Sequence, residues 1–280
     1  MLGYRHGFHA GHWSDVFKHA ILVQLLRALL RKDKPFFVLD THAGAGLYDL
    51  DSPQARKTGQ WREGIGRLWG QTGLSPALAD YLAQVQSFNG DKLGRYPGSP
   101  RLIRQLMRQQ DRLALTELHP GEFPYLKQEF AADSQVMVHR RDGYEALKAL
   151  LPPPVRRGLV LIDPAYEGGG EFDRLVEGLS VIHRRWPQAA VAVWYPILER
   201  GPSARFLSRV AKLQVGEALC AELGLHPYDS VLGINGCGMM LVNPPWQLDA
   251  ALEPLLPELL ERLRSGARGT IRLEWLTCNR

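Results

Sequence analysis

The sequence has few cysteines and no long apolar run. Its three cysteines, Cys220, Cys237 and Cys278, lie far apart and form no C-x-x-C pair, which indicates neither a disulfide framework nor a cysteine zinc site. The N-terminal stretch lacks the apolar segment of a signal peptide, and Arg27 interrupts the apolar run that follows it. We therefore expect no export signal, no membrane span and a cytoplasmic location.

Acidic residues are in slight deficit, with 29 Asp and Glu against 34 Lys and Arg, and the net charge is +5. This balance suits a polyanionic partner, although it is also compatible with a mildly basic enzyme of small substrates. A chain of 280 residues with 45% hydrophobic content can bury one substantial core. A single domain over residues 1–280 with an embedded insertion therefore fits better than two independent domains.

Seven short apolar runs alternate with segments of helical pattern. The runs cover residues 36–40, 113–118, 136–139, 158–163, 189–195, 217–223 and 239–243. Such runs are typical of strands buried on both faces, and their alternation with helices predicts a doubly wound, mostly parallel sheet. We therefore expect an α/β fold with a seven-stranded sheet.

The interval between the first two predicted strands is too long for a simple crossover. It spans about seventy residues, where roughly thirty would suffice. The apolar spacing of Leu78, Leu82 and Val85 favours a small helical insertion over residues 47–96. Its cations and tryptophans are suited to gripping nucleic acid, and a solvated helical face with buried tryptophans explains them equally well.

Aromatic rings, histidines and cations crowd residues 1–20. They are Tyr4, Arg5, His6, Phe8, His9, His12, Trp13, Lys18 and His19. Three of the histidines are spaced three apart, but no cysteine or carboxylate cluster completes a metal site, so we expect no metal. The mixture is typical of an arm that contacts RNA, with Tyr4, His6 and Lys18 as candidate contacts. A partly packed arm that closes over a cofactor cleft is the alternative, and both can hold.

A loop rich in small residues follows the first predicted strand. Asp40 ends the strand, and the segment Thr41-His42-Ala43-Gly44-Ala45-Gly46 comes next. Glycines let the backbone turn sharply and approach a ligand at the carboxyl edge of the sheet. The spacing does not fit G-x-G-x-x-G, which disfavours a dinucleotide. It looks like the D-x-x-x-G-x-G loop with which methyltransferases bind S-adenosylmethionine.

Acidic residues also end the second and third predicted strands. Glu117 lies where a carboxylate, which has only acceptors, can accept hydrogen bonds from both ribose hydroxyls. Asp142 can bond an adenine amine, while Gly143 leaves room for the ring. Either acid alone is more typical of a helix cap or a turn. Together with the loop at Asp40, in this order, they favour a cofactor site.

The fourth predicted strand is followed by Asp163-Pro164-Ala165-Tyr166. This resembles the [DNS]-P-P-[YFW] motif of amino-methyltransferases, with Ala165 in place of the second proline. The carboxylate of Asp163 and the carbonyl of Pro164 can accept both hydrogens of an exocyclic amine, and Asp163 is the candidate proton acceptor. Tyr166 offers a ring for stacking an extruded base. The alternative is an aspartate turn that caps a strand end.

A second segment, Asn243-Pro244-Pro245-Trp246, fits the same motif better by residue type. It follows the seventh predicted strand, toward the edge of the sheet, whereas the catalytic turn of this fold follows the fourth. We therefore interpret it as a structural turn with a packing tryptophan. The alternative is that it borders the substrate cleft.

With these residues in view, the whole chain resembles the bacterial large-subunit (23S) rRNA adenine-N6 methyltransferase J family. The blocks that carry the resemblance are YRHGFHAGHWSDVFKH, LDTHAGAG, RYPGSP, TELHP, RDG, LIDPAYE, WYP and GMMLVNPPW. The resemblance implies a class I Rossmann-like methyltransferase that uses S-adenosylmethionine. It also implies a monomer that modifies one adenosine of protein-free or partly assembled rRNA.

The resemblance also assigns roles to individual residues. It implies that Asp163 is catalytic and borders the cofactor, and that Tyr4 contacts the substrate. The implied cofactor contacts are His19, His42, Ser99, Glu117, Asp142, Gly143 and Asp163. Ala165 departs from the motif and relaxes the backbone of the turn. We expect the chemistry to survive this change, because Pro164 and Tyr166 remain.

Three rival functions stay in competition. A DNA adenine methyltransferase is the nearest, because the tetrapeptide at Asp163 does not read the sugar. A nicotinamide-dependent oxidoreductase would need a phosphate loop whose spacing is absent from the sequence. A non-catalytic RNA-binding module would keep a basic arm but has no need of Glu117 and Asp142 at successive strand ends.

Overall fold

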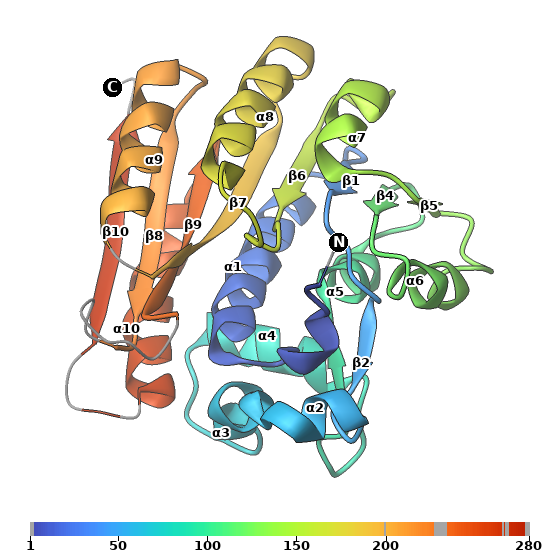
Figure 1. The fold of residues 1–280 in the computed structure, drawn as a ribbon, viewed down its shortest axis with the longest axis vertical. Coiled ribbons are helices and arrows are strands. Elements are labelled where there is room, and N and C mark those ends of the chain that lie inside the picture. The colour runs from blue at the N-terminus through green and yellow to red at the C-terminus, as the bar shows by residue number, and fades with distance from the viewer. Residues whose placement is uncertain (1–2, 199, 227–233, 265, 267–268, 278–280) are drawn as a thin grey trace.

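The computed structural model describes residues 3–198, 200–226, 234–264, 266 and 269–277. An eight-stranded sheet with helices on both faces forms its centre (Figure 1). The strands follow the order β10-β8-β9-β7-β6-β1-β4-β5. They are β1 (Phe37–Asp40), β4 (Arg112–Thr116), β5 (Val136–His139), β6 (Gly158–Ile162), β7 (Ala190–Ile197), β8 (Ala218–Gly224), β9 (Gly236–Val242) and β10 (Thr270–Thr277).

The predicted α/β fold is confirmed, and each of the seven predicted runs overlaps a strand of the sheet. The strands β5, β4, β1, β6 and β7 pair in parallel. β9 pairs antiparallel with both β7 and β8. The parallel centre is covered on both faces, so its strands are continuous apolar runs, and this made them visible in the sequence.

The expected count of seven strands is wrong by one. β10 adds an eighth strand, antiparallel to β8 at the edge of the sheet. Its side chains are only partly buried, and Ile271 is 43% exposed. Arg272 and Glu274 interrupt its apolar residues. An edge strand with solvent beside it carries no continuous apolar run, so the sequence pattern did not reveal it.

Successive residues of the central strands point to opposite faces and build two hydrophobic cores. Val38 and Leu161 belong to one core, whereas Leu39 and Ile162 belong to the other. Helices α1 (Trp13–Leu30), α4 (Pro76–Gln86), α5 (Ser99–Leu106), α6 (Phe123–Glu129) and α10 (Leu248–Leu263) contribute to the first core. Helices α7 (Gly143–Leu150), α8 (Glu171–Arg185) and α9 (Arg200–Leu213) contribute to the second.

Helix α1 is buried along almost its whole length. A helix that is apolar on all sides belongs in a core, and α1 packs beneath the sheet among α4, α5 and α10. The predicted arm over residues 1–20 therefore ends earlier than expected. A short 3-10 helix, η1 (His6–Phe8), precedes α1, and residues 13–20 are the first turns of α1.

The insertion predicted at residues 47–96 contains three helices and is closed by a two-stranded ribbon. β2 (Leu47–Asp49) pairs antiparallel with β3 (Arg95–Pro97). Between them lie α2 (Pro53–Thr58), the 3-10 helix η2 (Gln60–Glu63), α3 (Ile65–Leu68) and α4. Ser52 and Ser75 cap α2 and α4, each followed by a proline in the first turn.

The described helices include none that is long and apolar enough to cross a membrane. The longest is α1, with 18 residues. It lies in the core of the molecule.

The central strands tolerate no added volume at Gly158. A Cβ at this position would collide with the carbonyl oxygen of Phe37 and with the ring of Trp186. We expect Gly158→Ala to lower the free energy of unfolding by about 3 kcal/mol, as overpacking of a rigid core does. Gly90→Ala is the control, because nothing lies within 4 Å of its added Cβ. Equal urea midpoints for the two variants would contradict this packing.

Candidate active site

Two polar turns lie side by side at the carboxyl edge of the sheet. β1 and β6 are neighbouring parallel strands, and Asp40 pairs in register with Leu161. The amide of Thr41 donates to the carbonyl of Leu161 over 3.0 Å. The loop at residues 40–46 and the turn at Asp163 therefore share one edge, as the sequence predicted.

The loop after β1 is held by hydrogen bonds and tight turns. Gly44 and Gly46 have φ angles of 61° and 87°, which favour glycine. The hydroxyl of Ser99, at the start of α5, donates to the carboxylate of Asp40 over 2.7 Å. Asp40 is fully buried, and this burial raises its pKa to about 7. Ser99, a predicted cofactor contact, thus also supports the loop through Asp40.

Glu117 lies at the carboxyl end of β4 and faces this loop. Its carboxylate accepts a hydrogen bond from the amide of Gly44 over 2.8 Å and from that of His119 over 2.6 Å. Burial raises the pKa of Glu117, and the two amides partly offset the rise. A carboxylate offers about four acceptor positions. Two therefore remain for the hydroxyls of a ribose.

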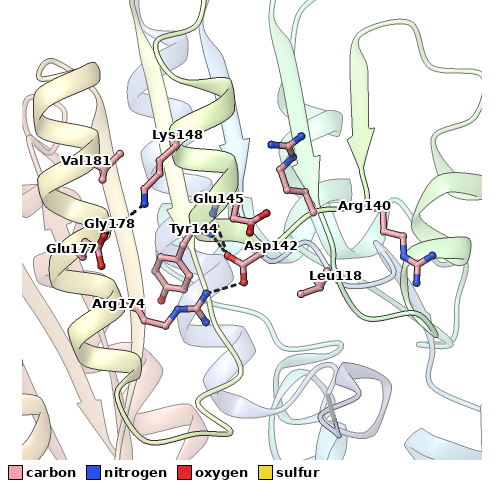
Figure 2. A pocket seen from close by; sticks show the side chains of 11 residues that line it. Leu118, Arg140, Asp142, Tyr144, Glu145, Lys148, Arg174, Glu177, Gly178 and Val181 are labelled. Carbon is pink, nitrogen blue, oxygen red and sulfur yellow. Dashed lines mark hydrogen bonds and ion pairs between the residues drawn. The ribbon is translucent and has the colours of Figure 1, made fainter.

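Asp142 serves as a helix cap, the alternative use of an acid at this position. One oxygen accepts from the amides of Tyr144 and Glu145, and the other accepts from Arg174 over 2.8 Å (Figure 2). Burial raises the pKa of Asp142, but the bonds from Arg174 and the helix backbone lower it below its ordinary value. A Cβ on Gly143 would collide with the carbonyl oxygen of Thr41.

A groove of about 660 Å³ opens between α7 and α8 beside Asp142 (Figure 2). Its lining includes four cations, and two of them pair with acids: Arg174 with Asp142 and Lys148 with Glu177. Arg140 and Arg141 are exposed and make no ion pair within the described part of the chain. The groove therefore adjoins the candidate cofactor site and carries unpaired positive charge at its rim.

Two histidines predicted to contact the cofactor lie near the same edge. The Nδ1 of His42 and the hydroxyl of Thr41 form a hydrogen bond of 2.8 Å, and burial lowers the pKa of His42 to about 4. The Nδ1 of His19 bonds the hydroxyl of Tyr96 over 2.8 Å, and burial lowers the pKa of His19 well below its ordinary value. Its Nε2 is buried without a partner in the described residues. A neutral histidine with one unmet ring nitrogen fits a polar ligand at this place.

The carboxylate of Asp163 pairs with Lys18. Lys18 is only 4% exposed, and its ammonium also contacts Asp15 over 2.9 Å. Burial lowers the pKa of Lys18, but the two carboxylates raise it above its ordinary value. Lys18 thus lies in helix α1 and not on an extended arm, and its contact with the substrate stays a prediction. A buried ammonium needs paired carboxylates, and these hold Lys18 inside the site.

Tyr4 and His6 connect to the same cluster. The hydroxyl of Tyr4 and the Nδ1 of His6 are 2.9 Å apart, and the Nε2 of His6 lies 2.9 Å from Asp15. The ring of Tyr4 stacks on His9 with centroids 5.3 Å apart. Both predicted substrate contacts are half-buried in this arrangement. The sequence pattern gave no sign of Asp15, because a single acid in the first turn of a helix is ordinary.

The turn after β6 presents Tyr166 in an unusual backbone conformation. Its φ is 54°, in the left-handed region. The hydroxyl of Tyr166 donates to the carbonyl of Trp194 over 2.7 Å, and its ring packs against Phe172 and Trp194. These contacts hold the ring of Tyr166 beside Asp163. Pro164 is buried, whereas Ala165 is exposed.

The second motif match lies at the opposite edge of the sheet. β9 runs antiparallel to β7, so the turn that begins at Asn243 lies beside the start of β7. The side chain of Asn243 donates to the carbonyls of Pro187 and Ala189 over 2.9 and 3.1 Å. These bonds give the turn a structural role, as expected. The expectation that its tryptophan packs in the interior is wrong, because Trp246 is 82% exposed. Within the described residues, no three histidine, cysteine, aspartate or glutamate side chains are grouped so that they could hold a metal ion.

Four features of the structure together define a class I methyltransferase. They are a mostly parallel sheet, a glycine loop after its first strand, an acid after the second and a D-P-x-Y turn after the fourth. The family model described as "Ribosomal RNA large subunit methyltransferase D, RlmJ" matches residues 33–277. The chain belongs to this family.

Two curated proteins and one crystal structure are similar to this chain over nearly its whole length. A protein of Escherichia coli named "Ribosomal RNA large subunit methyltransferase J" is 42% identical over 99% of both chains. A protein of the same name from Haemophilus influenzae is 40% identical, also over 99% of both. A crystal structure of a Legionella pneumophila protein has a TM-score of 0.88 at 33% identity, and the match covers 95% of this chain and 98% of that one.

The raised pKa of Asp40 predicts how its contribution to the free energy of unfolding depends on pH. Its pKa is about 7 in the folded protein, against an ordinary value of 3.8. The folded state therefore holds a proton that the unfolded state releases, and the contribution of Asp40 to stability falls as the pH rises from 4 to 7. Asp40→Asn removes this contribution, so its stability should rise relative to wild type over that range. Urea unfolding at several pH values measures the difference, and a difference independent of pH would contradict the assignment.

Proposed function

We propose that this chain transfers a methyl group from S-adenosylmethionine to N6 of one adenosine in 23S rRNA. The observation that carries the proposal is the shared sheet edge of the loop at Asp40 and the turn at Asp163. The names of the Escherichia coli and Haemophilus influenzae relatives support rRNA as the substrate. We further propose that the chain acts as a monomer in the cytoplasm, on protein-free or partly assembled rRNA.

The residues around the loop fit the methyl donor. Glu117 retains acceptor positions for a ribose diol, and Gly143 lets the start of α7 pack closely against Thr41. The unmet Nε2 of His19 is an available partner for a polar group of the ligand. When bound, S-adenosylmethionine supplies a methyl group on a positively charged sulfur. His42, Ser99 and Asp142 complete the proposed contacts.

The turn at Asp163 activates the acceptor. The lone pair of an adenine amine is delocalised into the ring, so the free amine is a poor nucleophile. The Asp163 carboxylate and the Pro164 carbonyl accept its two hydrogens and turn the lone pair toward the methyl group. Asp163 then accepts the proton that the amine releases, directly or through water. Alignment of the two reactants supplies most of the remaining rate.

Tyr166 is the proposed stacking surface for the extruded adenine. Its ring is fixed by the hydrogen bond to Trp194 and by contacts with Phe172. Stacking of a base on an aromatic side chain contributes about 1–3 kcal/mol. Ala165 lies on the exposed side of the turn, and the contacts of Tyr166 do not involve it.

RNA is proposed to bind across the carboxyl edge, on the N-terminal segment and on cations from two further segments. Tyr4 and His6 lie at the N-terminal segment, next to the insertion, where the hydroxyl of Thr58 donates to the carbonyl of Phe8 over 2.5 Å. The exposed cations of the insertion include Arg56, Lys57 and Arg62, and those of the groove rim are Arg140 and Arg141. Such cations contact phosphates without reading sequence.

Replacement of Asp163 tests the proposed chemistry. Asp163→Ala removes the hydrogen-bond and proton acceptor, and we expect methyl transfer from labelled cofactor to 23S rRNA to fall by roughly 10²–10⁴-fold. Cofactor binding, measured by calorimetry, should persist.

The matched control is Asp173→Ala on α8, whose carboxylate pairs with Arg209 on the surface. N6-methyladenosine in the product is identified by mass spectrometry. Transfer that prefers duplex DNA over rRNA, or a fully active Asp163→Ala, would refute the proposal.

A further inference from the structure

Asp15 lies at the junction of the N-terminal segment, helix α1 and the catalytic turn. It is 3% exposed and accepts three hydrogen bonds. One oxygen accepts from the ammonium of Lys18 over 2.9 Å. The other accepts from the Nε2 of His6 over 2.9 Å and from the amide of Gly11 over 3.0 Å. Burial raises the pKa of Asp15, but His6 and Lys18 lower it well below its ordinary value. The carboxylate is therefore ionised at neutral pH.

The backbone that carries this cluster is closely packed. Gly11 has a φ of 79°, and its carbonyl accepts a hydrogen bond from the amide of Ile65 over 2.9 Å. A Cβ on Gly64 would collide with that same carbonyl, so the insertion packs directly on the turn. Asp15 follows in the first turn of α1. Its carboxylate is thus held in place from the insertion, the N-terminal segment and the core.

The charges of the cluster do not cancel. Lys18 is a single buried ammonium between two carboxylates, Asp15 and Asp163, and the three groups together carry one net negative charge. Without Asp15, the ammonium would form an exclusive pair with Asp163. An exclusive pair would occupy the acceptor capacity that the amine needs, and it would cancel the charge that attracts a sulfonium.

We infer that Asp15 is a positioning residue for methyl transfer: it shares the ammonium of Lys18, which contacts one oxygen of Asp163, and so leaves the other oxygen of Asp163 to accept the amine. This inference rests on the proposed function. Asp15 touches neither substrate nor cofactor and acts through Lys18. A purely structural role, as an anchor for Gly11 at the start of α1, is the alternative.

Asp15→Asn separates the two roles, because the amide oxygen of asparagine can still accept from Gly11 and His6 and keep the anchor. Its NH2 group carries no charge and accepts no hydrogen bond from Lys18. We expect kcat on an rRNA fragment to fall by about 10- to 100-fold, as small losses of alignment do, with KM for RNA nearly unchanged. The acidic limb of the pH profile of kcat should move to lower pH, because Lys18 then stabilises the Asp163 carboxylate alone. A structural anchor would not move this limb.

Several titratable groups around Asp163 can affect the pH profile of kcat. Lys18 and Asp15 face it from α1, and Tyr4 and His6 from the N-terminal segment. The remaining titratable neighbours are Asp40, His42, Tyr166, Glu167 and Cys237. Asp15 contacts His6 and contributes to the raised pKa values of Tyr4 and Cys237, which titrate on the basic side. A shift of the acidic limb therefore reports the loss of the Asp15 charge, felt by Asp163 directly or through Lys18.

Two further variants make the test decisive. Asp15→Glu keeps the charge but moves the carboxylate by one methylene, so kcat should fall while the acidic limb stays at its wild-type pH. Asp80→Asn is the matched control, because Asp80 pairs with Arg27 of the same helix, and it should behave as wild type. Wild-type kcat and an unmoved limb in Asp15→Asn would overturn the inference. If that variant does not fold, an acidic limb displaced from its wild-type pH in Asp15→Glu, which keeps the charge, would overturn it.

A stability measurement distinguishes failure of this inference from failure of the proposed function. The lowered pKa of Asp15 stabilises the folded protein above pH 3.8, and this contribution is lost as the pH falls below that value. The stability gap between wild type and Asp15→Asn should therefore narrow in acid, whatever the substrate. A wild-type protein that methylates no rRNA adenosine would refute the function. A gap independent of pH would refute the charged state of Asp15 on which the inference depends.

Discussion

The buried ion cluster of Lys18, Asp15 and Asp163 is the interaction on which the site depends. Ions are costly to remove from water, and only close partners of opposite charge make their burial tolerable. These partners come from α1 and from the turn after β6, which are 145 residues apart in the chain. The cluster therefore joins the N-terminus to the proposed catalytic turn. Its net negative charge is suited to the positively charged methyl donor and to the proton loss of the proposed reaction.

The path of α1 explains why the N-terminus takes part in the site. Lys18, near the beginning of the helix, contacts Asp163 just after β6, whereas Arg157, just before β6, donates to the carbonyl of Leu29 near its end. The helix thus runs antiparallel to β6 and spans the sheet from its carboxyl edge to its amino edge. Tyr4 and His6, which precede the helix, are consequently placed at the carboxyl edge. The insertion packs on the turn at Gly11 and holds this end of the chain.

Most of the fold and much of the candidate site could be predicted from the sequence. Buried parallel strands are continuous apolar runs, and polar residues at their ends mark the functional edge, as Asp40, Glu117 and Asp163 show. Edge and ribbon strands were missed because one side faces solvent and interrupts the pattern. The exposure of Trp246 and the burial of Lys18 were also misjudged. Residue type alone predicts the reverse in both cases, since tryptophans are usually buried and lysines exposed.

The sequence by itself determined the class of fold, the order of its strands along the chain and the chemical types gathered at the strand ends. These are local properties, set by hydrophobic period and by backbone preference. The order of the strands already favoured the turn at Asp163 over the turn at Asn243. Only the tertiary structure gave the physical reason, which is strand direction: β6 is parallel to β1, whereas β9 is antiparallel to β7. It also decided that Lys18 serves a carboxylate inside the molecule, because pairing between distant residues leaves no periodic signal in the chain.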